Sequence, residues 1–262
     1  MDDSSLATQP VAPHRKLWSD WLTALFDLFF PPLCPVCGLR LGDGRRDPLC
    51  GGCWRSIEPI AAPYCIVCGT PFFAFGPRDE RHRCEECRRH RPPFAYARST
   101  ARYGGVIREA LHAFKFDRVT ALERPLGNLM AEVGRGMVSV EEITLLVPIP
   151  LHRSRQSARG FNQAELLARR LGKVWKIPVG QRVLRRLLAT RPQTELNRSE
   201  RRRNIRNAFS LTKPAAVRGQ HVLLVDDIYT TGATSAEAAR VLKRGGAAKV
   251  GVLTVARASF NR

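Results

Sequence analysis

The sequence predicts an α/β fold, in which helices cover both faces of a mainly parallel sheet, preceded by a small metal-binding module. From about residue 94 onward, short apolar segments alternate with amphipathic ones, as in strands buried on both faces and the helices that connect them. Before that point lie all eight cysteines, between residues 34 and 87. We therefore expect three parts: an apolar N-terminal tail and helix at 1–30, a metal module at 31–93 and an α/β domain at 94–262.

The N-terminal part has neither the basic start nor the apolar core of a signal peptide, because Asp2 and Asp3 follow the first residue. Apolar residues at 18–30 follow helical spacing, but the segment is too short to span a membrane and contains Asp20 and Asp27. We expect a helix that packs on the protein body. Contact with a membrane interface is the alternative, which the acidic residues disfavour. The expected location is the cytoplasm.

The cysteines form four Cys-x-x-Cys pairs. Two thiolates separated by two residues can bind one side of a tetrahedral ion, and a second pair completes the coordination. Disulfides are a poor explanation without an export signal, and no βαβ pattern surrounds the pairs as in a redox motif. We predict two structural Zn²⁺ sites that do no catalysis, joining the first pair with the second and the third with the fourth. Interleaved pairing remains open, since the gaps are similar. The eight predicted ligands are Cys34, Cys37, Cys50, Cys53, Cys65, Cys68, Cys84 and Cys87.

The α/β region is assigned element by element from apolar periodicity. Strands are expected where apolar runs are short, and helices where apolar residues recur at three- and four-residue intervals. In chain order we expect a strand at 100–103, a helix at 106–116, a strand at 145–149, a helix at 161–171, a strand at 222–225, a helix from 234 and a strand at 249–256. Ligands of such sheets bind at the carboxyl ends of the strands.

Residues 221–239 are the most informative segment. The apolar run at 222–225 ends in Asp226 and Asp227, which point where the hydroxyls of a sugar or a hydrated Mg²⁺ would lie. A loop of small residues follows and leads into the N-terminus of a helix. The backbone amides of the loop and the positive end of the helix dipole favour binding of a phosphate there. The predicted loop residues are Thr230, Thr231, Gly232, Ala233 and Thr234, where the glycine permits close approach of the backbone. An ordinary strand–turn–helix with an acidic loop is the alternative, and it accounts for fewer of these features.

This segment resembles the 5-phosphoribosyl-1-pyrophosphate (PRPP) motif of type I phosphoribosyltransferases. It differs from the P-loop pattern, because no lysine follows the glycine. The resemblance implies that Asp226 and Asp227 hold the ribose 2′- and 3′-hydroxyls and that the loop at 230–234 holds the 5-phosphate. Mg²⁺ is implied as the cation that accompanies PRPP.

Two basic segments are candidates for the same ligand. After the strand at 145–149, the side chains of Arg153, Arg155 and Arg159 leave its carboxyl end in a loop that could face a pyrophosphate. Residues 190–209 contain many arginines and few apolar residues, as expected of a mobile flap over the site. An exposed, solvated charged surface is the alternative for both.

Four segments in this order resemble the ComF family, a bacterial group associated with competence and DNA uptake. They are PPLCPVCG, VPIPLHRSRQSARGFNQAELLA, an arginine-rich loop ending in RRNIRNAF, and VLLVDDIYTTGAT. The resemblance covers nearly the whole chain from about residue 18. It implies a doubly wound phosphoribosyltransferase fold behind a double zinc ribbon. It also implies single-stranded DNA as a partner, and DNA-uptake machinery at the inner face of the membrane.

The charge distribution bears on the same partner. The chain carries a net charge of +20, and residues 151–206 contain 16 lysines and arginines against 3 acidic residues, a net of +13. PRPP would use some of these cations, and the surplus fits an extended polyanion such as single-stranded DNA. Aromatic residues that could stack on bases are Phe72, Phe73, Phe75 and Trp175, although packing in the core or the module explains each equally well.

Two functions follow from these observations. We favour a PRPP-binding protein that handles single-stranded DNA during uptake, because the ligand loop and a surplus of basic residues coexist. The alternative is an active phosphoribosyltransferase of nucleotide metabolism, in which a nitrogen nucleophile displaces pyrophosphate from PRPP. The sequence shows no acceptor pocket, so no catalytic residue is assigned, and whether the protein is an enzyme stays open.

Overall fold

The computed structural model describes residues 32–42, 47–72, 82–189 and 198–258. The helix expected at 18–30, residues 190–197 of the expected flap, and Phe73 and Phe75 lie outside the described residues. Among the helices that are described, none has the length and apolar character needed to cross a membrane.

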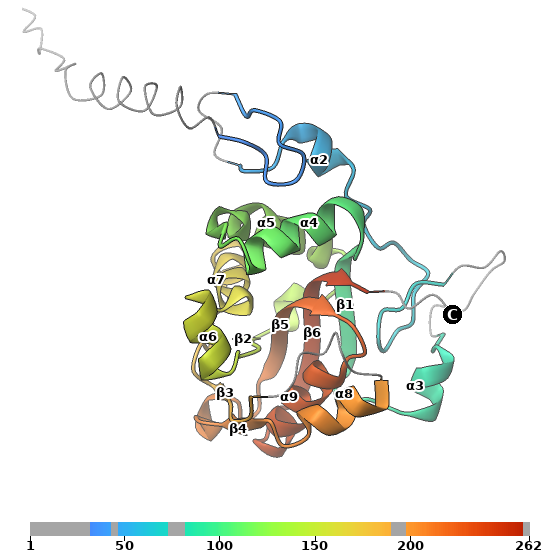
Figure 1. The fold of residues 1–262 in the computed structure, drawn as a ribbon. Coiled ribbons are helices and arrows are strands. Elements are labelled where there is room, and N and C mark those ends of the chain that lie inside the picture. The colour runs from blue at the N-terminus through green and yellow to red at the C-terminus, as the bar shows by residue number, and fades with distance from the viewer. Residues whose placement is uncertain (1–31, 43–46, 73–81, 190–197, 259–262) are drawn as a thin grey trace, which may run out of the picture.

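The centre of the molecule is a parallel sheet of four strands in the order β1-β6-β5-β2 (Figure 1). Their bounds are β1 Tyr96–Arg102, β2 Leu145–Pro148, β5 His221–Tyr229 and β6 Lys249–Arg257. The inner strands β5 and β6 consist mostly of buried residues, as expected from their continuous apolar runs.

Alternate side chains of the inner strands enter two different cores, because successive residues of a strand point to opposite faces. Leu223 and Val225 of β5 join one core together with buried residues of three helices: α4 Gly105–Lys115, α5 Glu123–Arg135 and α7 Gln163–Trp175. Val222 and Leu224 join the other core with α9 Ala233–Arg244. Both faces of the sheet are therefore covered, which confirms the predicted fold class.

Several elements differ from the sequence prediction. The loop expected to carry the basic residues after β2 is instead the short helix α6 Arg153–Arg159, which His152 caps at its start and Gly160 ends at φ 84°. The helix expected at 161–171 begins at Gln163, because the Asn162 side chain accepts a hydrogen bond from the Ala164 amide and caps it.

Other elements were not predicted. Besides α5, they are the antiparallel strands β3 Leu184–Arg186 and β4 Phe209–Leu211, the helix α8 Arg198–Ile205, and the 3₁₀ turns η1 Thr120–Leu122, η2 Val140–Glu142 and η4 Pro214–Ala216. Strands of three residues are too short for an alternating pattern to identify them.

The first part of the cysteine-rich module lies beside α4 and α5, and the segment that follows it runs along the outer edge of β1 (Figure 1). The module contains the short helices α2 Gly51–Arg55 and α3 Glu85–Arg89. The Ile60 amide donates to the Thr100 carbonyl at 3.0 Å, and the Ala97 amide donates to the Val67 carbonyl at 2.6 Å. These bonds satisfy backbone groups that an edge strand would otherwise expose.

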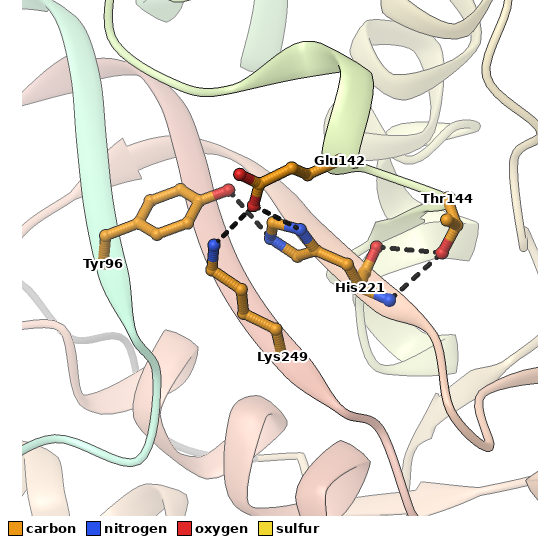
Figure 2. A network of polar contacts seen from close by, with 5 residues as sticks. All are labelled: Tyr96, Glu142, Thr144, His221 and Lys249. Carbon is orange, nitrogen blue, oxygen red and sulfur yellow. Dashed lines mark hydrogen bonds and ion pairs between the residues drawn. The ribbon is translucent and has the colours of Figure 1, made fainter.

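A network of polar side chains closes the amino end of the sheet (Figure 2). The His221 Nε2 atom lies 3.1 Å from the Tyr96 hydroxyl, and its Nδ1 atom lies 3.8 Å from Glu142 Oε2, which also pairs with Lys249 at 2.7 Å. The Thr144 hydroxyl donates to the His221 carbonyl and accepts from its amide. The network therefore joins the first residues of β1, β5 and β6 to the segment that leads into β2.

Candidate functional site

The acidic pair lies at the carboxyl end of the sheet. Strand β5 continues past Asp226 and Asp227 as far as Tyr229, so the carboxylates lie within the strand and not after it. The Asp227 amide donates to Asp226 Oδ1 at 2.9 Å, which fixes the orientation of one carboxylate relative to the other. The predicted phosphate loop then turns directly into α9, whose first residue is Ala233.

Gly232 is the position in this loop where glycine is required. Its φ of +75° lies in the left-handed region, which disfavours other residues. A Cβ atom added there would also lie 2.6 Å from Cζ of Tyr229 and closer still to the hydroxyl of the same ring. The loop thus rests directly on the Tyr229 ring, and this support places its backbone at the N-terminus of α9.

Carboxylates and loop line one cavity of about 530 Å³. Asp226, Asp227, Thr230, Gly232, Ala233 and Thr234 all face this cavity, which the fold brings together with basic residues from distant parts of the chain. The four lysine and arginine side chains among the lining residues are Lys115, Arg155, Arg159 and Arg186. Of the predicted pyrophosphate arginines, two therefore line the cavity, and the exposed Arg153 does not. Thr231 faces a neighbouring cavity instead.

The two carboxyl groups lie in different surroundings. The Lys115 ammonium lies 2.6 Å from Asp227 Oδ2, and both side chains are largely buried, with about 15% of each exposed. Burial raises the pKa of Asp226 to about 7, and the negative charge of Asp227 contributes to the same shift. Around neutral pH the Asp226 carboxyl is therefore close to its titration point.

Two of the basic residues that line the cavity, Lys115 and Arg186, were not predicted from the sequence. Burial and the charge of Arg155 together lower the pKa of Arg186 to about 10, so two cations are held near each other in the wall. Lys115 had a detectable signal, because it follows Leu111 by four residues and so falls on the apolar face of the predicted helix. Arg186 had none, since its strand comes from a short arginine-rich stretch without a clear period.

Each group of four cysteines is arranged as a tetrahedral metal site. The Sγ atoms within each group all lie within 4.8 Å of one another, which joins the first pair with the second and the third with the fourth. The sulfur atoms of Cys34 and Cys53 are 3.8 Å apart, and those of Cys68 and Cys84 are 3.6 Å apart. A disulfide requires about 2.05 Å, whereas Zn–S bonds of about 2.3 Å give a tetrahedron with edges of about 3.8 Å. The residues therefore fit structural Zn²⁺, and the predicted pairing is confirmed.

The second cysteine group is connected to the phosphate loop through Arg257. This buried guanidinium donates to the Cys68 carbonyl at 2.7 Å and to the Thr70 hydroxyl, and it lies 4.5 Å from the centre of the Tyr229 ring. Tyr229 in turn supports Gly232. The contacts form a continuous path from the second metal site to the loop.

Burial decides which of the predicted base-stacking residues and which part of the expected flap are accessible. Trp175 is 7% exposed and donates its indole N–H to the Ala131 carbonyl, so it belongs to the core and is unavailable for base stacking. Phe72 is half-buried, with its ring edge-on to His82. In the expected flap, Ile205 and Phe209 are buried and the Asn207 amide donates to Glu237 of α9, so the end of this segment packs on the body of the domain.

Comparisons with known proteins agree with this architecture. A model of the double zinc ribbon domain matches residues 25–88, and a model of the phosphoribosyl transferase domain matches residues 158–259. Competence protein F of Haemophilus influenzae is 30% identical over 88% of this chain and 99% of its own length. DNA utilization protein YhgH of Escherichia coli (strain K12) is 32% identical over the same shares.

A more distant relative is competence protein ComFC of Bacillus subtilis, which is 28% identical over 80% of this chain and 85% of its own length. Among solved structures, glutamine PRPP amidotransferase from B. subtilis is 20% identical, with a TM-score of 0.33, over 50% of this chain and 25% of that one.

Proposed function

Because the chain belongs to the ComF family, we propose that it binds PRPP with Mg²⁺ and handles single-stranded DNA in the cytoplasm during DNA uptake. The observation that carries PRPP binding is the cavity of about 530 Å³ in which the acidic pair and the phosphate loop face basic side chains. Relatives named for competence and DNA utilization support the role in DNA handling.

In this proposal each part of the cavity holds one part of PRPP. The loop amides and hydroxyls at 230–234 bind the 5-phosphate at the start of α9. Asp226 and Asp227 accept hydrogen bonds from the ribose hydroxyls, and the pyrophosphate with its Mg²⁺ lies against Arg155 and Arg159. Lys115 releases Asp227 when the ribose arrives and then faces the pyrophosphate.

Calorimetry with PRPP in the presence and absence of Mg²⁺ tests this assignment. We expect saturable binding that depends on Mg²⁺, and weaker binding of ribose 5-phosphate, because it lacks the pyrophosphate that the arginines would contact. A matched control is Arg153→Ala, which removes an arginine of α6 that does not line the cavity. Failure of PRPP to bind at millimolar concentration with Mg²⁺ would contradict the proposal.

The role in DNA handling draws on charge. The +13 segment at 151–206 supplies more cations than one PRPP molecule needs, and phosphate neutralisation by such cations gives sequence-independent binding that weakens with salt. We further propose that the protein works beside the DNA-uptake machinery at the inner face of the membrane. Binding of a labelled oligonucleotide at several salt concentrations tests the first step.

The second candidate function is transfer of the ribose 5-phosphate group. The C1–O bond to pyrophosphate would break, an oxocarbenium-like centre would form, and a nitrogen nucleophile would attack C1 as pyrophosphate leaves. The cationic wall beside the acidic pair favours this reading, because it would offset the charge of the departing pyrophosphate. Incubation with PRPP, Mg²⁺ and a panel of nucleobases would separate the two functions, since turnover that releases pyrophosphate with one acceptor identifies an enzyme.

A further inference from the structure

Exposed aromatic side chains are concentrated at the mouth of the ligand cavity. Among the phenylalanine, tyrosine and tryptophan residues that the structure describes, those classed as exposed are Tyr103, at 37%, and Phe116, at 58%. Both line the cavity that contains Asp226 and Asp227. A single exposed aromatic residue needs no explanation, but two that converge on one cavity indicate a contact surface for a ligand.

Phe116 is tied to the cavity by its position in the chain. It follows Lys115, whose ammonium pairs with Asp227 on the cavity floor, and it caps the C-terminus of α4. At this end of the helix, Phe114 is the aromatic residue that packs in the core. It is fully buried, with its ring 5.7 Å from that of Phe161. The exposed ring of Phe116 is therefore not a displaced core residue.

Cationic and aromatic groups hold this ring in place. The Arg159 guanidinium lies 5.2 Å from the centre of the Phe116 ring, and the His112 ring lies 4.8 Å away at an angle of 41°. Arg118 donates to the Ala158 carbonyl at 2.9 Å, which fixes the end of α6 beside the loop that follows Phe116. The result is a fixed ring at the rim with positive charge beside it.

From this arrangement we propose that Phe116, together with Arg159 and Tyr103, forms a stacking platform for an unpaired nucleobase of single-stranded DNA. Bases of single strands stack on aromatic rings and on guanidinium planes, and each stack contributes about 1–3 kcal/mol with little sequence preference. The strand's phosphates would follow the arginines of α6, which begins at the same rim. In a duplex, neighbouring base pairs cover the base faces, so the platform selects single strands.

This inference rests on the proposed function in DNA handling and adds a base-dependent contact to it. The decisive measurement is fluorescence anisotropy with a labelled oligo(dT) and with an abasic oligonucleotide of equal length and charge. Wild-type protein should bind the base-bearing strand about tenfold more tightly, as expected for one stack of about 1.4 kcal/mol. Phe116→Ala should lose this preference, and Phe116→Trp should keep it.

A matched control distinguishes loss of base stacking at Phe116 from the general effect of removing an exposed apolar side chain. Leu187 is 46% exposed and is not among the residues that line the cavity, so Leu187→Ala should leave the preference unchanged. Phe116→Ala should also leave the salt dependence of DNA binding unchanged, because no phosphate contact is removed.

The outcomes distinguish this inference from the proposed function. Equal affinity of wild-type protein for base-bearing and abasic strands would overturn the platform but leave binding by the basic surface intact. Absence of binding to either strand would overturn both, whereas PRPP calorimetry would still test the ligand loop independently. Free thymidine that binds as tightly as the oligonucleotide, and depends on Phe116, would assign the platform to a free acceptor base and overturn the single strand as its occupant.

Discussion

The two ends of the parallel sheet use the same kinds of residue to different effect. At the amino end, Glu142 pairs with Lys249 and lies close to His221, which hydrogen-bonds to Tyr96, so charged and polar groups satisfy one another (Figure 2). At the carboxyl end, burial and the charge of Asp227 raise the pKa of Asp226 to about 7. The polar groups at the amino end hold the strands together. At the carboxyl end, the buried Asp226 is costly to ionise, and a ligand that binds this carboxylate can offset the cost.

The largest expected effect comes from removing zinc, because a structural zinc ion contributes about 10–16 kcal/mol of apparent binding free energy. The carboxyl end should lose order through Arg257, which links Cys68 to Tyr229 beneath the loop, and the amino end should not. Hydrogen exchange before and after verified chelation should show lost protection at 65–72 and 229–233. Protection at His221 should be retained and serves as the internal reference. Unchanged protection at 229–233 would contradict a link between the second metal site and the loop.

Replacing both carboxylates is the next largest change. Asp226→Ala with Asp227→Ala should weaken PRPP binding by about 100-fold or more in calorimetry, since charge-assisted hydrogen bonds contribute about 1.5–3 kcal/mol each. Glu142→Gln removes a carboxylate from the amino end and should leave PRPP affinity unchanged. Equal losses in the two variants would show that the ends do not differ in function.

Removing the lysine of the buried ion pair tests the electrostatics of the carboxyl end by stability. Lys115→Ala leaves Asp227 largely buried without its partner at 2.6 Å, so the free energy of unfolding at pH 8 should fall by about 3 kcal/mol. Lys115→Arg keeps the charge and should recover most of this loss. Denaturant unfolding measures both, and a Lys115→Ala variant as stable as the wild type would contradict the pairing.

The pH dependence of stability should reveal the cost at Asp226. Its pKa is raised from an ordinary value of 3.8 to about 7, so the unfolded chain releases this proton first and stability falls between pH 4 and pH 7. Asp226→Asn removes the buried charge and should be more stable than the wild type at pH 8, by on the order of 1–4 kcal/mol. PRPP affinity of the wild type should rise between pH 6 and pH 8, because the Asp226 carboxylate that would accept hydrogen bonds from the ribose forms in this range. The Asp226→Asn variant should lose this rise. A variant of lower stability at pH 8 would contradict this assignment.

The smallest effect is expected at the amino end. Burial and the charge of Lys249 lower the pKa of His221, so the unfolded chain takes up a proton first and stability falls as the pH decreases below about 6.5. Tyr96→Phe removes the hydroxyl that contacts His221 and should cost about 1 kcal/mol without changing PRPP affinity. Thermal unfolding from pH 5 to pH 8 measures both effects, and a shift in PRPP affinity would show that this network reaches the ligand.

Much of the candidate site could be predicted because its parts are contiguous in the chain. The acidic pair, Gly232 and the start of α9 follow one another along a strand, a turn and a helix, so local geometry alone places them together. Four Cys-x-x-Cys pairs made two tetrahedral sites predictable, and the structure decided between the pairing that we preferred and the interleaved alternative. Arg153 does not line the cavity, and its exposed place in α6 could not be predicted, because a polar helix of seven residues has no apolar period to identify it.

The rest was decided by the tertiary structure. Lys115 of α4 and Arg186 of β3 reach the cavity only because the sheet brings distant segments together at one end, and no local pattern encodes that meeting. Burial likewise decided which aromatic residues are available, placing Trp175 in the core and Phe116 at the rim. The sequence by itself determined the chemistry of the loop and the metal ligands, since neighbouring residues share their geometry. Only packing decided which charges face that loop, because their energies depend on what surrounds them.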